Sequence, residues 1–185
     1  MNDIAKILKA LEFASGRHKS QLRKGEEKTP YINHPIQVAS LLANEGEEND
    51  IELLTAAILH DVIEDTVNNP EEKGQLINQI SDLFGEEVLL IVNEVTDDKS
   101  LEKNERKRLQ IEQSSHKSEK AKKLKIADKI ANVHDITFYP PKDWTLERKM
   151  KYLDWAEQVV AGLRGVNKKL EDLFDETLTI GRAKI

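Results

Sequence analysis

The sequence predicts an all-α protein, and two of its features support that prediction. Leu, Ile, Lys, Glu and Ala dominate the 185 residues, while aromatic residues make up only 5%, a composition that favours helices over sheets. Apolar residues recur at the three- and four-residue spacing of a helix face in one segment after another. Hydrophobic residues account for 38% of the chain, enough for one core, so we expect a single domain over 1–185.

The N-terminal part predicts two helices separated by a polar loop. Apolar residues at helical spacing begin at Ile4, so we expect a helix over 3–19. The polar stretch 20–29 is expected to be a loop. Proline favours the first position of a helix and moves the residue before it out of the helical region, which places His34 at the start of a helix over about 35–44.

The central segments predict three further helices. The first is expected over 51–65, and the second begins at Asn69 and Pro70, where an N-cap residue, a proline and two acidic residues follow one another. That second helix runs to about Leu83. The apolar run 86–96 is short enough to be a buried strand, but the helices on both sides favour a helix here too.

The C-terminal part predicts two more helices and then one long helix. The two helices are expected at about 101–114 and 118–136, and the two prolines at 140–141 then break the chain. A single amphipathic helix is expected from near Thr145, because apolar residues continue on one side as far as Leu173.

Composition restricts the partners of the chain. Its 28 basic and 34 acidic residues give a net charge of −6, which disfavours duplex nucleic acid as a partner. The absence of cysteine excludes disulfides and zinc–thiolate sites, and it fits a reducing compartment such as the cytoplasm. The longest uncharged apolar run, 53–59, is too short to cross a bilayer, and the N-terminus lacks the pattern of a secretory signal. We therefore expect a cytoplasmic protein without a membrane partner.

Segment 53–65 combines an apolar helix with four polar side chains at one end. His60 and Glu64 are four residues apart, as are Asp61 and Asp65, so each pair is expected to share a helix face. Buried carboxylates are costly unless they are paired or bind a metal, and imidazole with carboxylate suits manganese, iron or zinc. The residues alone are equally compatible with a helix end that emerges into solvent and binds nothing.

The dipeptide His60-Asp61 is the one that gives the HD phosphohydrolases their name. The chain resembles the hydrolase domain of RelA/SpoT-type alarmone enzymes, and within it the stand-alone small alarmone hydrolases of the metazoan SpoT homolog type. The resemblance covers roughly residues 5–175 and implies a bundle of about eight to ten helices. The matching segments, in the family's order, are 23–24, 29–35, 56–66, 94–99, 106–110, 126–132 and 155–160.

The resemblance also implies the roles of individual residues. Glu64 and Asp65 match the acidic pair implicated in catalysis. One metal ion, usually Mn²⁺, is implied. The residues in the positions of its ligands are His34, His60, Asp61 and Asp128.

The substrate-binding residues are implied in the same way. Arg23 and Lys24 match residues that contact the nucleotide, and Arg23 is suited to stack on the base. Asn132 matches a side chain beside the metal and the substrate ribose. Lys99 and Arg106 are candidate phosphate ligands within a wider set of basic residues. Such a set is also typical of solvated helix faces that balance nearby acids.

One polar stripe permits a second interpretation. Asp128 and Asn132 are four residues apart on one predicted helix face, together with Lys125 and Asp135. Without the resemblance, a solvated stripe is the more natural interpretation. His134 and Asp135 form a second His-Asp pair, but this pair does not match the family's metal dipeptide, so His134 is expected to be structural or at the surface.

The activity implied by the resemblance is removal of the 3′-pyrophosphate of the alarmone (p)ppGpp, which gives GDP or GTP and pyrophosphate. The partner is then a small-molecule nucleotide carrying phosphates on both ends of its ribose. Three alternatives stay open: an HD-type phosphatase that acts on another nucleotide such as NADPH, a nucleotide-binding module without turnover, and a helical scaffold. The sequence leaves open whether the protein is a monomer or a homodimer.

Overall fold

The computed structural model describes residues 2–25, 27–67 and 69–185. Throughout these ranges the regular structure is helical, and the one β-type pairing is an isolated bridge between Leu22 and Pro30. The all-α prediction is therefore confirmed. The helices are α1 (Asp3–Arg17), α2 (Asn33–Ser40), the π-helix η1 (Leu41–Glu45), α3 (Ile51–Leu59), α4 (Val62–Asp65), α5 (Pro70–Phe84), α6 (Glu86–Val95), α7 (Lys103–Gln113), the 3₁₀ turn η2 (Ser114–His116), α8 (Glu119–Phe138), α9 (Leu146–Ala161) and α10 (Lys168–Lys184).

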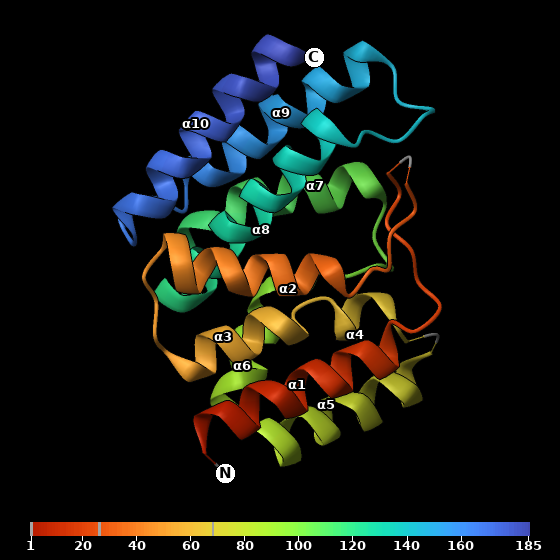
Figure 1. Cartoon of the computed structure of the whole chain (residues 1–185). Coiled ribbons are helices and arrows are strands. Elements are labelled where there is room, and N and C mark those ends of the chain that lie inside the picture. Colours follow the sequence, from red (N-terminus) through yellow and green to blue (C-terminus); the bar gives the residue numbers. More distant parts are fainter. Residues whose placement is uncertain (1, 26, 68) are drawn as a thin grey trace.

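Helices α3 and α8 form the centre of the molecule (Figure 1). Helix α8 packs against α2, α3, α6, α9 and α10, while α3 packs against α1, α2 and α6. At one end α9 lies beside α10, and at the other α1 contacts α5 through the rings of Phe13 and Phe84, whose centroids are 5.7 Å apart. Because both central helices are covered on several sides, some of their polar residues are buried, namely Thr55 on α3 and Lys125, Asp128 and Lys129 on α8.

Helix α5 begins and ends where the sequence predicts. Asn69 caps α5, since its side chain accepts a hydrogen bond from the backbone N–H of Glu72, and Pro70 occupies the first helical position. Gly85 ends the helix at φ = 95°, in the region that favours glycine. The ambiguous apolar run that follows is the helix α6.

The expected long C-terminal helix is wrong, because the chain forms α9 and α10 with a break between them. Gly165 adopts φ = 92° within the break, and the side chain of Asn167 caps α10 by accepting from the N–H of Leu170 at 3.1 Å. The carboxylate of Glu171 accepts from the N–H groups of Gly165 and Val166. The break therefore satisfies its own backbone groups, as a helix end requires.

The expected helix over 51–65 is also interrupted. Helix α3 ends at Leu59, and α4 begins at Val62 after Asp61 has adopted φ = −95° and ψ = −5°. The assumption that His60 and Glu64 share one continuous helix face therefore does not hold. The start of α2 agrees better with the prediction, since His34 lies in its first turn. Within the described part of the chain, no helix combines the length and the apolar character needed to span a membrane.

Candidate active site

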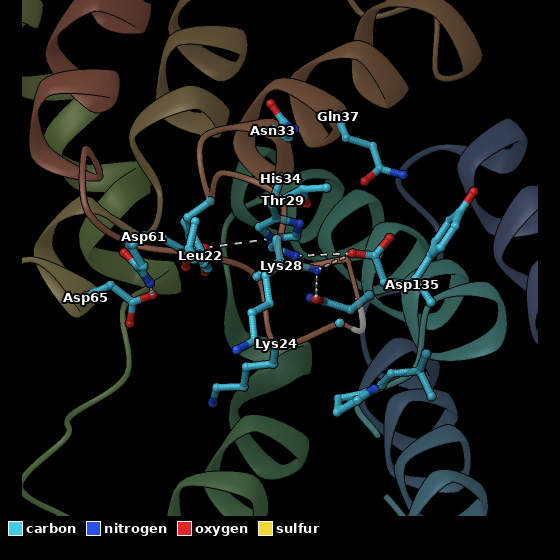
Figure 2. A pocket seen from close by; sticks show the side chains of 18 of the residues that line it. Leu22, Lys24, Lys28, Thr29, Asn33, His34, Gln37, Asp61, Asp65 and Asp135 are labelled. Atoms are coloured by element: carbon cyan, nitrogen blue, oxygen red, sulfur yellow. Dashed lines mark hydrogen bonds and ion pairs between the residues drawn. The ribbon is translucent and has the colours of Figure 1, made fainter. Parts of the chain in front are cut away.

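A cavity of about 920 Å³ opens between the loop that precedes α2, the turn at α4, and the faces of α7 and α8. Its volume is in the range of small-molecule sites. Figure 2 shows Asp61 and Asp65 on one side of this cavity and Asp135 on the other. Most residues that were predicted from the sequence line it, and they are Arg23, Lys24, His34, Asp61, Glu64, Asp65, Lys99, Arg106 and Asn132.

The two remaining predicted residues are buried behind this lining. His60 directly follows the last residue of α3 and is 4% exposed, and Asp128 lies in the middle of α8 and is 6% exposed. One ligand atom from each of His34, His60 and Asp128 lies within 4.8 Å of the other two. The Nε2 atom of His34 is 3.2 Å from Oδ1 of Asp128, and that of His60 is 3.9 Å from the same oxygen.

Asp61 lies against the two histidines of this cluster. Its Oδ2 atom is 3.0 Å from Nε2 of His60 and 3.7 Å from Nε2 of His34. The hydroxyl of Tyr31 donates a hydrogen bond of 2.6 Å to the same oxygen. Burial and the nearby charge of Asp61 raise the pKa of Tyr31, so the phenol stays a donor. The fold thus brings together all four side chains that the resemblance gives as metal ligands.

The donor atoms of this cluster fit a divalent cation. Nδ1 of His60 donates to the carbonyl oxygen of Ala57 at 2.7 Å, which leaves Nε2 to face the carboxylates. Burial acts to lower the pKa of His60, but the charge of Asp61 and a hydrogen bond with it outweigh burial and raise that pKa to about 9. A divalent cation bound here would therefore displace a proton from Nε2. That Nε2 atom is buried against two carboxylates, 3.0 Å from Oδ2 of Asp61 and 3.9 Å from Oδ1 of Asp128. An imidazole nitrogen oriented in this way beside the Asp61 and Asp128 carboxylates is a donor set that Mn²⁺, Fe²⁺ or Zn²⁺ accepts.

Asp128 is held ionised at the centre of the cluster. Burial acts to raise the pKa of its carboxyl, but the charge of Lys129 and a hydrogen bond with His34 outweigh burial and hold that pKa well below its usual range. The Nζ atom of Lys129 is 2.8 Å from Oδ2, on the side away from the histidines. Asn132 donates to Oδ1 at 2.6 Å. Each carboxylate oxygen therefore has a distinct set of partners.

The acidic pair of α4, Glu64 and Asp65, lies next to the cluster formed by His34, His60, Asp61 and Asp128. Glu64 accepts a 3.1 Å hydrogen bond from the backbone N–H of Asp97. Burial, reinforced by the charges of Asp97 and Asp61, raises the pKa of Glu64 to about 7. Asp65 accepts from Nε2 of Gln21 at 2.8 Å and forms an ion pair with Lys99. One carboxyl can therefore exchange protons near neutral pH, and the other is fixed by two partners.

The predicted substrate-binding residues reach the cavity from three segments. Arg23 hydrogen-bonds to Asn132 and Asp135 on α8, while Lys24 lies at the open side (Figure 2). Lys99 comes from the loop before α7, and Nη1 of Arg106 on α7 is 3.9 Å from Oε1 of Glu64. The structure therefore gathers cationic groups beside the acidic pair.

Sequence reasoning gave no role to several residues around this cavity. Tyr31 lies inside a matched segment, which was a usable signal, and Lys129 directly follows a predicted ligand. Asp97 and Gln21 contact the acidic pair from distant loops, so no local spacing pointed to them. Three aromatic residues also line the cavity, and they are Tyr139, Trp144 and Tyr152.

Comparisons with known proteins agree with this geometry. The model of the HD domain family matches residues 10–151. The guanosine-3′,5′-bis(diphosphate) 3′-pyrophosphohydrolase MESH1 of Xenopus tropicalis is 49% identical, with 94% of this chain and 93% of the relative covered. The enzyme of the same name from Homo sapiens is 46% identical, with 92% of each chain covered.

A solved structure is similar over almost the whole chain. It is that of a metazoan ortholog of SpoT that hydrolyzes ppGpp and plays a role in starvation responses. The two chains are 44% identical, the TM-score is 0.89, and the alignment covers 98% of this chain and 97% of the other. The resemblance found in the sequence motifs is thereby confirmed. This chain belongs to the HD-domain family, and within it to the MESH1-type guanosine-3′,5′-bis(diphosphate) 3′-pyrophosphohydrolases.

Proposed function

We propose that this chain removes the 3′-pyrophosphate of (p)ppGpp and releases GDP or GTP together with pyrophosphate. The observation that carries the proposal is the position of the buried His60 Nε2, which faces two carboxylates beside a cavity that also holds an acidic pair and several cations. The relatives that cover most of the chain carry the name of this activity. The absence of cysteine supports a cytoplasmic location.

One Mn²⁺ ion is the proposed cofactor. His34, His60, Asp61 and Asp128 would hold it, since their ligand atoms converge from helices α2 and α8 and from the turn between α3 and α4. A divalent ion bound there neutralises phosphate charge and lowers the pKa of a bound water. Tyr31 keeps the Asp61 carboxylate oriented, and Lys129 does the same for Asp128.

Glu64 is proposed as the group that moves a proton. With a pKa of about 7, its carboxylate accepts a proton and gives it up again near neutral pH, as a general base requires. The Asp97 N–H fixes Oε2, while Oε1 lies 3.9 Å from the cationic groups of Lys99 and Arg106 in the cavity wall. Asp65 is held by Gln21 and Lys99 and is proposed to orient the attacking water.

The cationic groups of the cavity are proposed to bind the nucleotide. Lys24, Lys99 and Arg106 would contact phosphate oxygens, because all three line the cavity and the last two approach the acidic pair. Arg23 would stack on the base and Asn132 would contact the ribose. Binding of the phosphates to Lys99 would compete with its ion pair to Asp65, which would couple substrate binding to the position of that carboxylate.

The direct experiment incubates the purified chain with Mn²⁺ and ppGpp and measures pyrophosphate and GDP. We expect release of both products, and a loss of at least 100-fold in the Asp61→Asn variant because a ligand at the metal is weakened. The matched control is Asp175→Asn, which makes the same change in an exposed ion pair with Arg164 and should keep wild-type activity. GTP and NADPH serve as competing substrates. Tight binding of ppGpp without turnover in any divalent metal would contradict the proposal.

A further inference from the structure

The acidic residue Asp135 contacts an arginine that comes from the opposite end of the sequence. It lies on α8, seven positions after Asp128 on the same helix face, and its Oδ2 atom accepts from Nε and Nη2 of Arg23 at 3.1 and 2.7 Å. The side chains of Arg23 and Asp135 are 16% and 28% exposed. The pair thus lies in the wall of the cavity, in part shielded from solvent.

The ion pair with Asp135 limits the ways in which Arg23 can bind a substrate. Two of its N–H groups are already bonded to a carboxylate that neutralises the guanidinium charge, so little of that charge remains for substrate phosphates. The flat face of the group is still usable. One face lies over the ring of Tyr31, with Cζ 5.5 Å from the ring centroid, and the side chain borders the cavity. A planar cation in such a position is suited to stacking on a second planar group.

The same arginine is connected to the metal-ligating cluster. Nη2 of Arg23 also donates to Oδ1 of Asn132 at 3.1 Å, and Asn132 donates to Oδ1 of Asp128 at 2.6 Å. Three residues of one α8 face, at positions 128, 132 and 135, therefore set the place of Arg23 relative to the proposed metal. The sequence was compatible with either a binding site or a solvated helix face for this polar stripe. In the structure, Asp128, Asn132 and Asp135 are connected by hydrogen bonds to Arg23.

We propose that Asp135 is a positioning residue that holds the Arg23 guanidinium as a platform for the nucleobase. The inference rests on the proposed function for the identity of the nucleotide. It assigns different tasks to two groups of lining residues, with base recognition at the Arg23–Asp135 pair and phosphate binding at Lys24, Lys99 and Arg106. Asp135 acts through Arg23 and has no contact of its own with the base.

The Asp135→Asn variant tests this division. It keeps the shape of the side chain and removes the charge that orients Arg23, so we expect KM for ppGpp to rise roughly tenfold with kcat unchanged. The dissociation constant of GDP, measured by calorimetry, should rise by the same factor, while inhibition by inorganic pyrophosphate, which has no base, stays the same. Asp135→Glu should recover part of the loss. Asp175→Asn, in the exposed pair with Arg164, serves as the control and changes none of these values.

A double-mutant cycle separates positioning from direct contact. If Asp135 acts only through Arg23, adding Asp135→Asn to Arg23→Met leaves KM where Arg23→Met alone puts it. The inference would be overturned if the fold-changes in KM of the two single variants multiplied in the double variant. An unchanged KM in Asp135→Asn would overturn it as well. Melting temperatures of all variants identify any that lose the fold, and for these the conservative Asp135→Glu replaces the asparagine variant.

Failure of this inference can be distinguished from failure of the proposed function. A wild-type chain that does not hydrolyse ppGpp refutes that function, yet binding of GDP and pyrophosphate to the variants still tests the role of Asp135. A wild-type chain that hydrolyses ppGpp, with an Asp135→Asn variant that matches it in KM and in GDP binding, refutes the role of Asp135 alone.

Discussion

Replacing Lys129 by methionine removes the cation that compensates the buried Asp128 carboxylate. The two side chains are 4% and 9% exposed, and Nζ lies 2.8 Å from Oδ2. Methionine preserves the volume and the packing against Trp155, over whose ring the ammonium lies at 4.9 Å. Removing one partner of a buried ion pair costs about 3–5 kcal/mol, because the other charge is left in a medium of low dielectric constant. In a chain of this length, 3 kcal/mol corresponds to a fall in Tm of roughly 6–12 °C.

The loss of stability caused by Lys129→Met should be smaller when Mn²⁺ is bound. In protein freed of metal by EDTA, no metal ion compensates Asp128 once Lys129 is replaced, so the largest cost is expected there. With saturating Mn²⁺, an ion held by His34, His60, Asp61 and Asp128 would compensate the same carboxylate. The difference in unfolding free energy between wild type and Lys129→Met should therefore shrink, and the variant should bind Mn²⁺ more tightly because a nearby repelling cation is gone.

Urea denaturation with EDTA and with Mn²⁺ measures both quantities. The control is Lys168→Met, which removes a lysine from an exposed ion pair with Asp172, where a change below about 1 kcal/mol is expected. An equal loss of stability for Lys129→Met with and without Mn²⁺ would refute the reasoning, because it would mean that the ion does not compensate Asp128.

Three further predictions concern protons, metal and the chain break. At saturating Mn²⁺, log kcat/KM should rise with unit slope as pH increases and level off at or below about pH 7. The reason is that Glu64 must lose its proton to act as a base, and a nearby cation favours its ionised form. A profile of kcat/KM that is flat from about pH 5.5 to 8.5 would contradict this. Mn²⁺ at 100 times its dissociation constant should raise the unfolding free energy by about 2.7 kcal/mol in a thermal or urea titration, and His60→Ala, which removes a donor from the cluster, should abolish most of that gain. Gly165→Ala should lower stability by about 1 kcal/mol since φ is 92° there, whereas Gly74→Ala on the exposed side of α5 should raise it by about 0.5–1 kcal/mol; equal effects of the two changes on Tm would speak against the left-handed turn.

The sequence by itself determined the fold class and the types of residue that gather at the site. Helix starts such as Asn69-Pro70 depend on hydrogen bonds within a few residues of the chain, so local pattern was sufficient to place them. The buried character of α3 was visible for the same reason, and the histidine and carboxylates at its end pointed to divalent metal chemistry. The order of the matched motifs then gave the family.

The tertiary structure decided where the helices break and which charges meet. Apolar spacing continues from α9 into α10, so periodicity did not show the break. Gly165 and Asn167 are residue types that often end and begin helices, and they were the local signal for it. The contact of Arg23 with Asp135 joins residues 112 positions apart. Sequence spacing carries no information on such pairs, because they form only when the packing of α8 at the centre of the bundle brings a distant loop against its polar face.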